Sequence, residues 1–126
     1  MISLRFPWFW WGCGSLLLAF VVLGSLLPAR QVMPVPIDDK IMHALAYAVL
    51  TLWFSGLYLR GRDLSLIAVL MFLLGLMLDM LQGMVSTRTF DLWDVAANGS
   101  GILAAWLLAR TLLAGWCERV ERLLTV

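Results

Sequence analysis

Hydrophobic residues occur in four long runs along the chain, and short polar or proline-containing segments separate them. The runs lie at about 7–27, 40–59, 64–84 and 91–116. Each has about 20 residues, and an α-helix rises about 1.5 Å per residue, so each run reaches about the 30 Å thickness of a bilayer core. The pattern therefore predicts an all-α integral membrane bundle of four transmembrane helices, forming a single domain over residues 1–126.

The first run, 7–27, begins in the way a secretory signal does. Trp8, Trp10 and Trp11 cluster at its start, as aromatic residues do at membrane interfaces. However, the run is longer than the ~7–15 apolar residues of a typical signal, and no small-x-small cleavage site follows it. We therefore expect an uncleaved helix. Its default role is packing, because it holds no acidic residue, lysine, arginine or histidine.

The segments between the runs carry turn signals. Three prolines lie in 28–38, and proline removes a backbone donor and restricts the residue before it, so this segment is predicted to be an extended loop. The sequence Arg-Gly-Arg-Asp at 60–63 predicts a tight turn. The residues after Trp116 are predicted to form a short charged tail.

Composition agrees with a membrane protein. The chain is 63% hydrophobic and 13% charged, with a mean hydropathy of +0.93, whereas soluble domains are about 45–50% apolar. The formal net charge of +1 gives no basic face for nucleic acid. Cys13 and Cys117 are both expected near the cytoplasmic side, where thiols stay reduced, so no disulfide is predicted.

Basic residues predict which end of the bundle faces the cytoplasm. Four helices put both termini on one side of the membrane. That side carries Arg5, Arg60, Arg62, Arg110, Arg119 and Arg122, and the other side carries Arg30, Lys40 and Arg88. Because lysine and arginine accumulate on the cytoplasmic side, both termini are predicted to be cytoplasmic.

Polar residues gather at the opposite, outer end, where the second run starts, the third ends and the fourth starts. A carboxylate in the middle of a membrane helix costs roughly 2.5–3.5 kcal/mol and therefore needs inward-facing partners. Two runs place such residues at i, i+3, i+7, on one side of a helix. We call the whole set of candidate ligand-binding residues the outer polar cluster: Lys40, His43, Tyr47, Asp79, Gln82, Arg88, Asp91, Asp94 and Asn98. Its one-sided position predicts a pocket between helices that opens away from the cytoplasm.

The ordered set of polar residues resembles the VanZ-like family of small membrane proteins. The similarity covers about half the chain, in the pattern Asp39-Lys40-x-x-His43-x-x-x-Tyr47, then Gln82, then Arg88-x-x-Asp91-x-x-Asp94-x-x-x-Asn98-x-x-Gly101. Asp79 is a departure, because the family usually has a glutamate there. The resemblance implies a multi-pass protein of the bacterial inner membrane. The VanZ-like family takes its name from a protein linked to low-level resistance to teicoplanin.

Each member of the outer polar cluster has a structural interpretation as well as a functional one. Arg88 has the planar fork that suits a phosphate, with Lys40 as a second cation, but it can equally pair with an aspartate of the cluster. His43 can act as a base, a proton relay or a metal ligand, or be a hydrogen-bonded packing residue. Asp91 and Asp94 with His43 form a weak signature for a divalent cation. Asn98 is expected to cross-link the second and fourth helices.

Known catalytic signatures are absent from the sequence: it has no glycine-rich phosphate loop, no Cys/His metal set and no serine–histidine nucleophile motif. No cofactor is expected. The leading prediction is a protein that binds or handles an anionic envelope lipid or lipid-linked precursor at the outer leaflet. The alternative is a small assembly subunit of a larger membrane complex, or a homo-oligomer, in contact through a small-residue seam at Ala97, Gly101, Ala105 and Ala109. A metal-assisted hydrolase or transferase is a third reading.

Overall fold

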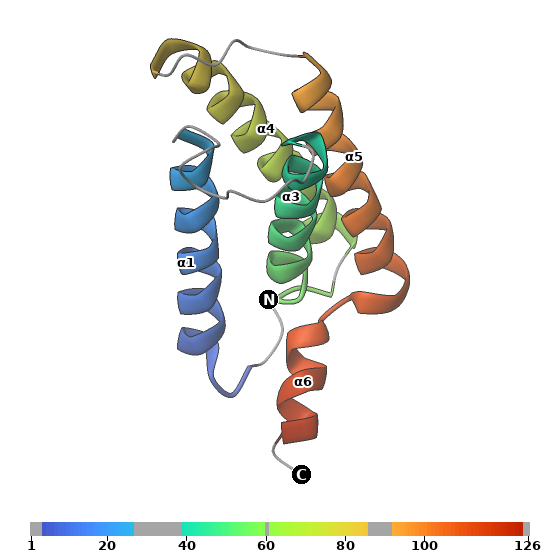
Figure 1. Cartoon of the computed structure of the whole chain (residues 1–126). Helices are drawn as coiled ribbons and strands as arrows, with labels where there is room; N and C mark the ends of the chain where they lie inside the picture. Colours follow the sequence, from blue (N-terminus) through green and yellow to red (C-terminus); the bar gives the residue numbers. More distant parts are fainter. Residues whose placement is uncertain (1–3, 27–38, 60, 86–91, 125–126) are drawn as a thin grey trace.

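The computed structural model describes residues 4–26, 39–59, 61–85 and 92–124. Within these ranges the chain is helical and contains no strand, which confirms the all-α prediction. The elements, labelled as in Figure 1, are α1 (Pro7–Leu26), α3 (Asp39–Ser55), α4 (Gly61–Val85), α5 (Leu92–Leu108), the π-helical turn η1 (Ala109–Leu113) and α6 (Trp116–Leu124).

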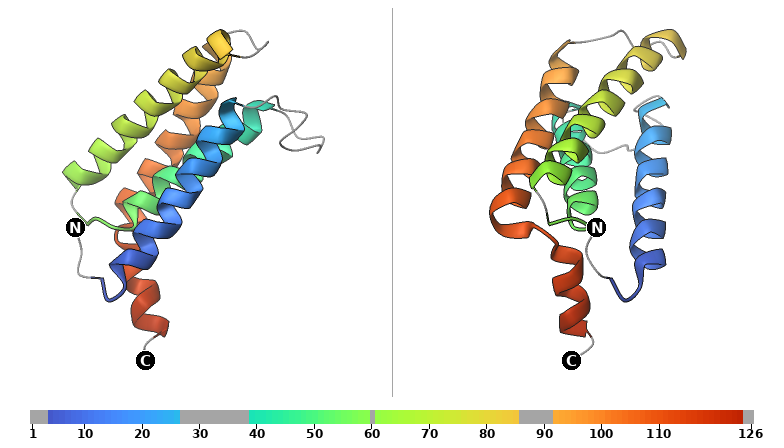
Figure 2. Two further views of the ribbon diagram at one scale, coloured as in Figure 1. Left: turned by 90° about the vertical axis from the view of Figure 1, so that its left-hand side faces the viewer. Right: turned by 180° about the vertical axis from the view of Figure 1, so that it is seen from behind.

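The four longer helices, α1, α3, α4 and α5, alternate in direction (Figures 1 and 2). The start of α3, the end of α4 and the start of α5 therefore lie at one end of the bundle, which we call the loop end. The start of α1, the end of α3, the start of α4 and α6 lie toward the other end, the α6 end. The closest packing is between α3 and α5, and α4 and α1 complete the bundle around α3.

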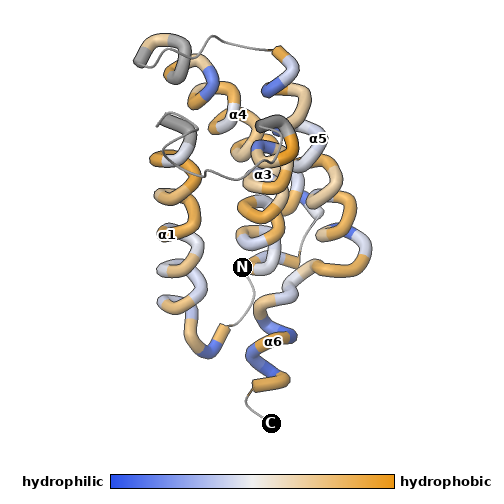
Figure 3. The backbone as a smooth tube through the Cα atoms, viewed as in Figure 1, coloured by the Kyte–Doolittle hydropathy of each residue, from blue (hydrophilic) through white to orange (hydrophobic). Residues whose placement is uncertain are grey.

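Among the described residues, three helical segments are long and apolar enough to cross a membrane: Pro7–Gly24, Gly61–Leu81 and Leu92–Leu113. The apolar part of α3, Ile41–Ser55, is shorter than these three. Large apolar side chains are exposed along α1, α4 and α5. Figure 3 shows apolar residues along much of these helices, and strongly polar residues on α6 and near the loop end of α4 and α5. The molecule thus presents an apolar outer surface, as a protein of the bilayer does.

The small-residue seam of α5 packs against α3. A Cβ atom at Gly101 would collide with the backbone carbonyl oxygen of Ala44, and Ala105 and Ala109 are also buried. At Gly101 the prediction that a small residue lets another backbone approach closely is confirmed, and the backbone is that of α3 in the same chain. A contact of the seam with a second chain stays a prediction.

Two predicted boundaries were wrong. The second helix ends at Ser55 instead of 59, and residues 61–63 belong to α4 instead of a turn. Gly56 directly follows α3 and has no room for a side chain, because Trp116 and Cys117 occupy the space, with the Cys117 sulfur only 2.6 Å from an added Cβ. Asp63 lies in the first turn of α4, where its negative charge suits the helix dipole, so the helix starts before it.

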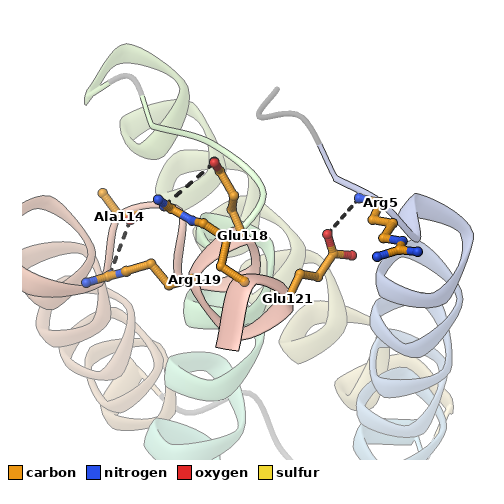
Figure 4. A network of polar contacts seen from close by, with 6 residues as sticks. Arg5, Ala114, Glu118, Arg119 and Glu121 are labelled. Atoms are coloured by element: carbon orange, nitrogen blue, oxygen red, sulfur yellow. Dashed lines mark hydrogen bonds and ion pairs between the residues drawn. The ribbon is translucent and has the colours of Figure 1, made fainter. Parts of the chain in front are cut away.

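The fourth predicted helix, 91–116, does not continue unbroken to Trp116. After the π-helical turn, Gly115 adopts a positive φ of 62°, which a glycine accepts without strain, and the chain then starts α6. The side chain of Arg119 donates hydrogen bonds to the carbonyl oxygens of Leu112 (2.7 Å) and Ala114 (3.3 Å), which the helix end leaves without helical partners. Figure 4 shows the bond to Ala114. The predicted charged tail is therefore a docked helix.

Candidate functional site

A chain of hydrogen bonds joins three members of the outer polar cluster. The amide nitrogen of Asn98 on α5 donates to the carboxylate of Asp79 on α4 at 3.1 Å. The amide oxygen of Asn98 lies 3.2 Å from Nδ1 of His43 on α3. The predicted cross-link from Asn98 to the second helix is confirmed, and it extends to the third. One amide side chain thus ties together the three helices that meet at the loop end.

This polar chain lies inside the bundle. Asp79 is 4% exposed and Asn98 is 1% exposed, whereas His43 is half-buried. Each residue is about one to two helical turns inside the end of its helix. A buried carboxylate and amide in apolar helices are tolerated because they satisfy each other.

Tyr47 and Gly75 border the polar chain. Tyr47 follows His43 by one turn of α3 and is 2% exposed. A Cβ at Gly75 on α4 would lie 3.2 Å from the Asn98 amide nitrogen and 3.3 Å from the Tyr47 ring, closer than atoms of that size normally pack. The absence of a side chain at Gly75 therefore leaves the room in which Tyr47 and Asn98 fit beside α4.

Asp94 lies in the first turn of α5 and is half-buried. It precedes Asn98 by one turn, so both residues are on the same side of the helix. Its carboxylate is near the positive end of the helix dipole, a favourable position for a negative charge. Asp94 therefore extends the polar side of α5 from the buried chain toward the loop end.

The remaining members of the outer polar cluster lie outside what the structure describes. These are Arg88, Asp91 and the side chains of Lys40 and Gln82. The backbones of Lys40 and Gln82 are in the first turn of α3 and the last turn of α4, at the loop end. Within the described ranges, no group of three or more histidines, cysteines, aspartates or glutamates is arranged to hold a metal ion. The predicted roles of the two cations stay predictions.

The α6 end carries a second polar site that the sequence analysis missed. The carboxylate of Glu121 accepts hydrogen bonds from the backbone nitrogens of Arg5 (2.6 Å) and Phe6 (3.0 Å), and from the indole nitrogen of Trp10 (2.7 Å). Figure 4 shows the Glu121 side chain pointing at Arg5, just before α1. A local signal did exist, because Cys117 and Glu121, spaced i, i+4, share one side of a short helix.

Three tryptophans pack around this second site. The ring centroids of Trp10, Trp53 and Trp116 are 5.4–5.5 Å apart in all three pairs. The indole nitrogen of Trp53 donates to the Trp10 carbonyl at 3.0 Å, and that of Trp116 donates to the Leu52 carbonyl at 2.6 Å. Each aromatic ring therefore has its polar atom satisfied, and α1, α3 and α6 are joined at one point.

The charge of Glu121 is set by these contacts. Burial works against the charged form, but the hydrogen bonds from Arg5, Phe6 and Trp10 and the positive charge of Arg5 outweigh it, so the pKa of Glu121 lies below its usual 4.5. Burial and the charge of Glu121 together raise the pKa of the Cys117 thiol from 9.0 to about 12. Glu121 is therefore a carboxylate and Cys117 a protonated thiol at neutral pH.

Comparison with known proteins gives one relative. No protein-family model and no solved structure matches the chain. An uncharacterized protein of the fission yeast Schizosaccharomyces pombe is 32% identical over 97 residues, which are 75% of this chain and 60% of that protein. The match thus spans three fifths of the relative's length. Because the relative is a yeast protein, the predicted bacterial membrane rests on the VanZ-like resemblance alone.

Proposed function

We propose that the protein is a VanZ-like membrane protein that binds the headgroup of an anionic lipid or lipid-linked precursor at its loop end. The observation that carries the proposal is the buried chain of Asp79, Asn98 and His43, which lies at that end. Ionisable and amide groups inside membrane helices are costly, and they are found mainly where a protein binds or moves a polar group.

The proposal includes four spans with both termini in the cytoplasm. Support for α3 as a fourth span comes from Ile41, Leu45 and Val49, which are exposed at i, i+4, i+8 and form an apolar stripe suited to lipid. Support for the orientation comes from the arginines on the elements of the α6 end: Arg5, Arg62, Arg110, Arg119 and Arg122. The loop end then faces the outer leaflet.

The orientation has a direct test. Fusion reporters placed at Arg62 and after Val126 should both report the cytoplasm. A reporter that reads the outer side at either position would overturn the orientation. It would then move the polar chain of Asp79, Asn98 and His43 to the cytoplasmic leaflet.

In the proposed complex, Arg88 and Lys40 meet the negatively charged headgroup. Arg88 belongs to the connection between α4 and α5, which joins the two helices that carry Asp79 and Asn98. The guanidinium forks onto phosphate oxygens, and an ammonium adds a second positive charge. Asp91 and Asp94 then position these cations. The resemblance extends the proposal to the bacterial cell envelope and to teicoplanin susceptibility.

One specific observation favours the second candidate function, that of an assembly subunit. Asp79, Asn98 and His43 hydrogen-bond to one another within the protein. Such bonds between helices can serve only to fix the register of the helices. In that case the protein is a small assembly subunit, and the polar chain only sets the arrangement of its own helices.

Native mass spectrometry of gently extracted protein separates these functions. The comparison is wild type, Arg88→Ala, and Arg62→Ala as a control that removes an exposed arginine at the α6 end. Lipid binding predicts a phosphorylated lipid on wild type and Arg62→Ala that is lost from Arg88→Ala. An undiminished lipid signal in Arg88→Ala would show that Arg88 does not bind the headgroup. A stoichiometric protein partner on all three variants, without a selective lipid, would favour the assembly subunit.

A further inference from the structure

When Asp79 is ionised, the hydrogen bonds around Asn98 fix the position of a proton on His43. A carboxylate can only accept hydrogen bonds, so the atom of Asn98 that faces an ionised Asp79 is its amide nitrogen. The amide oxygen then faces Nδ1 of His43, and an amide oxygen also only accepts. Nδ1 must therefore carry the hydrogen. In the neutral ring, Nε2 is left with its lone pair.

We infer that Asp79 and Asn98 are positioning residues that hold His43 with Nε2 as a hydrogen-bond acceptor, so that the loop end selects a lipid headgroup with a donor such as a hydroxyl. This inference rests on the proposed function, because it names the chemistry of the headgroup. A fully substituted phosphodiester offers only acceptors, and it has nothing to donate to Nε2.

The difference in burial between the buried pair Asp79 and Asn98 and the more exposed His43 supports the role of the pair as positioning residues. Asp79 and Asn98 are closed off from the surface, whereas His43 keeps part of its surface exposed. His43 is therefore the member of the chain that a ligand from outside the bundle reaches. Positioned imidazoles in other proteins are oriented in the same way by a hydrogen-bonded group behind the ring. Here the buried carboxylate of Asp79 orients Asn98, and Asn98 orients the His43 ring.

The same three residues have one other arrangement. A protonated Asp79 would donate to the Asn98 oxygen, the Asn98 nitrogen would donate to Nδ1, and the His43 hydrogen would then sit on Nε2. The neutral ring would present a donor and would select an acceptor in the headgroup. The position of the His43 hydrogen thus reports the charge of Asp79 through the amide between them.

Nitrogen NMR measures this position directly. The chain has one histidine, so 15N-histidine labelling yields the signals of a single imidazole. At a pH where the ring is neutral, wild type should show the one-bond N–H coupling on Nδ1 and an unprotonated Nε2. A coupling on Nε2 instead would overturn the inference.

Two variants separate positioning from packing. Asp79→Asn keeps the volume of the side chain and its ability to hydrogen-bond, but an amide at position 79 can either donate to Asn98 or accept from it. The preference for a hydrogen on Nδ1 of His43 should therefore be lost while the helices stay packed. Asn98→Asp keeps an acceptor for Nδ1–H, so the preference should be retained in the protein that folds. An unchanged preference in Asp79→Asn would show that Asp79 does not position His43.

Lipid selectivity tests the headgroup chemistry. Binding is measured in nanodiscs that contain phosphatidylglycerol, phosphatidylmethanol or phosphatidylcholine. The first two lipids carry the same negative charge, but only phosphatidylglycerol has hydroxyl donors. Wild type should prefer it to phosphatidylmethanol by about fivefold, the usual factor for one hydrogen bond, and His43→Leu should lose this preference.

The outcomes distinguish this inference from the proposed function. Equal binding of the two anionic lipids, both tighter than phosphatidylcholine, would overturn the donor selectivity and leave anionic-headgroup binding intact. No preference for either anionic lipid over phosphatidylcholine would overturn the proposed function, and the donor selectivity with it. The NMR result on His43 would then decide the positioning role alone.

Discussion

The indole nitrogen of Trp10 donates a 2.7 Å hydrogen bond to the carboxylate of Glu121, although 111 positions separate the two residues. The same carboxylate accepts the backbone hydrogens of Arg5 and Phe6, just before α1. Negative charge at the N-terminal end of a helix is favourable because it satisfies unpaired donors and complements the helix dipole. Glu121 thus anchors α6 to the start of α1.

Removal of this carboxylate should release the start of α1. In Glu121→Ala, amide hydrogen exchange at Arg5 and Phe6 should become about tenfold faster or more, because hydrogen bonds to a charged group are among the strongest. Glu118→Ala is the matched control, since Glu118 belongs to the same helix and pairs at 3.6 Å with the exposed Arg122 of the next turn, a weak kind of interaction. Equal effects of the two substitutions would contradict the anchoring role.

Acid should release the same contact. The pKa of Glu121 is below 4.5 in the folded protein, whereas in the unfolded chain it is near 4.5, so the charged form favours the folded state. The contribution is therefore complete above pH 4.5 and is lost as the pH falls through the lower, folded value. Exchange protection at Arg5 and Phe6, measured relative to the interior of α5, should fall below pH 4.5. In Glu121→Ala this pH dependence should be absent.

Cys117 should be nearly inert toward thiol reagents. Its pKa of about 12, against an ordinary 9.0, lowers the thiolate fraction at mildly alkaline pH by about 1000-fold, and the thiolate is the reactive form. In a Cys13→Ser background, maleimide labelling of Cys117 should be correspondingly slow in the folded protein and fast in denaturant. Adding Glu121→Ala should accelerate labelling, because both the nearby charge and the docking of α6 are lost. Rapid labelling of the folded parent would refute the burial of this thiol.

A methyl group at Gly101 should separate α3 from α5. In Gly101→Ala the new Cβ would meet the backbone of Ala44, which cannot rotate away as a side chain does, so the free energy of unfolding should fall by about 2–3 kcal/mol. Gly12→Ala is the control, because nothing lies within 4 Å of an added Cβ there and alanine is the better helix former. Unfolding by denaturant in detergent micelles provides the comparison. A stable Gly101→Ala protein would show that the two helices are not held at this spacing.

Hydropathy by itself predicted the long apolar helices. The first predicted span, 7–27, agrees with α1 to within a residue at its end, because the run of apolar side chains that makes a span is a local property. The spacing of small residues likewise predicted the close backbone contact at Gly101. The convergence of His43, Asp79 and Asn98 followed from the alternation of four helices together with the cost of polar groups in an apolar layer.

Tertiary structure decided what happens at the α6 end. The burial of Glu121 depends on contacts with Arg5, Phe6 and Trp10, which are 111–116 positions away from it. The break at Gly115 lets α6 turn toward these residues. A charged nine-residue segment cannot form a stable helix from its own hydrogen bonds, so its sequence resembles a solvated tail. Docking against the start of α1 and against Trp53 of α3 makes it a helix and turns one of its charges inward. The hydrophobic pattern therefore determined the long apolar helices, and the long-range hydrogen bonds of the Glu121 carboxylate determined how α6 meets the start of α1.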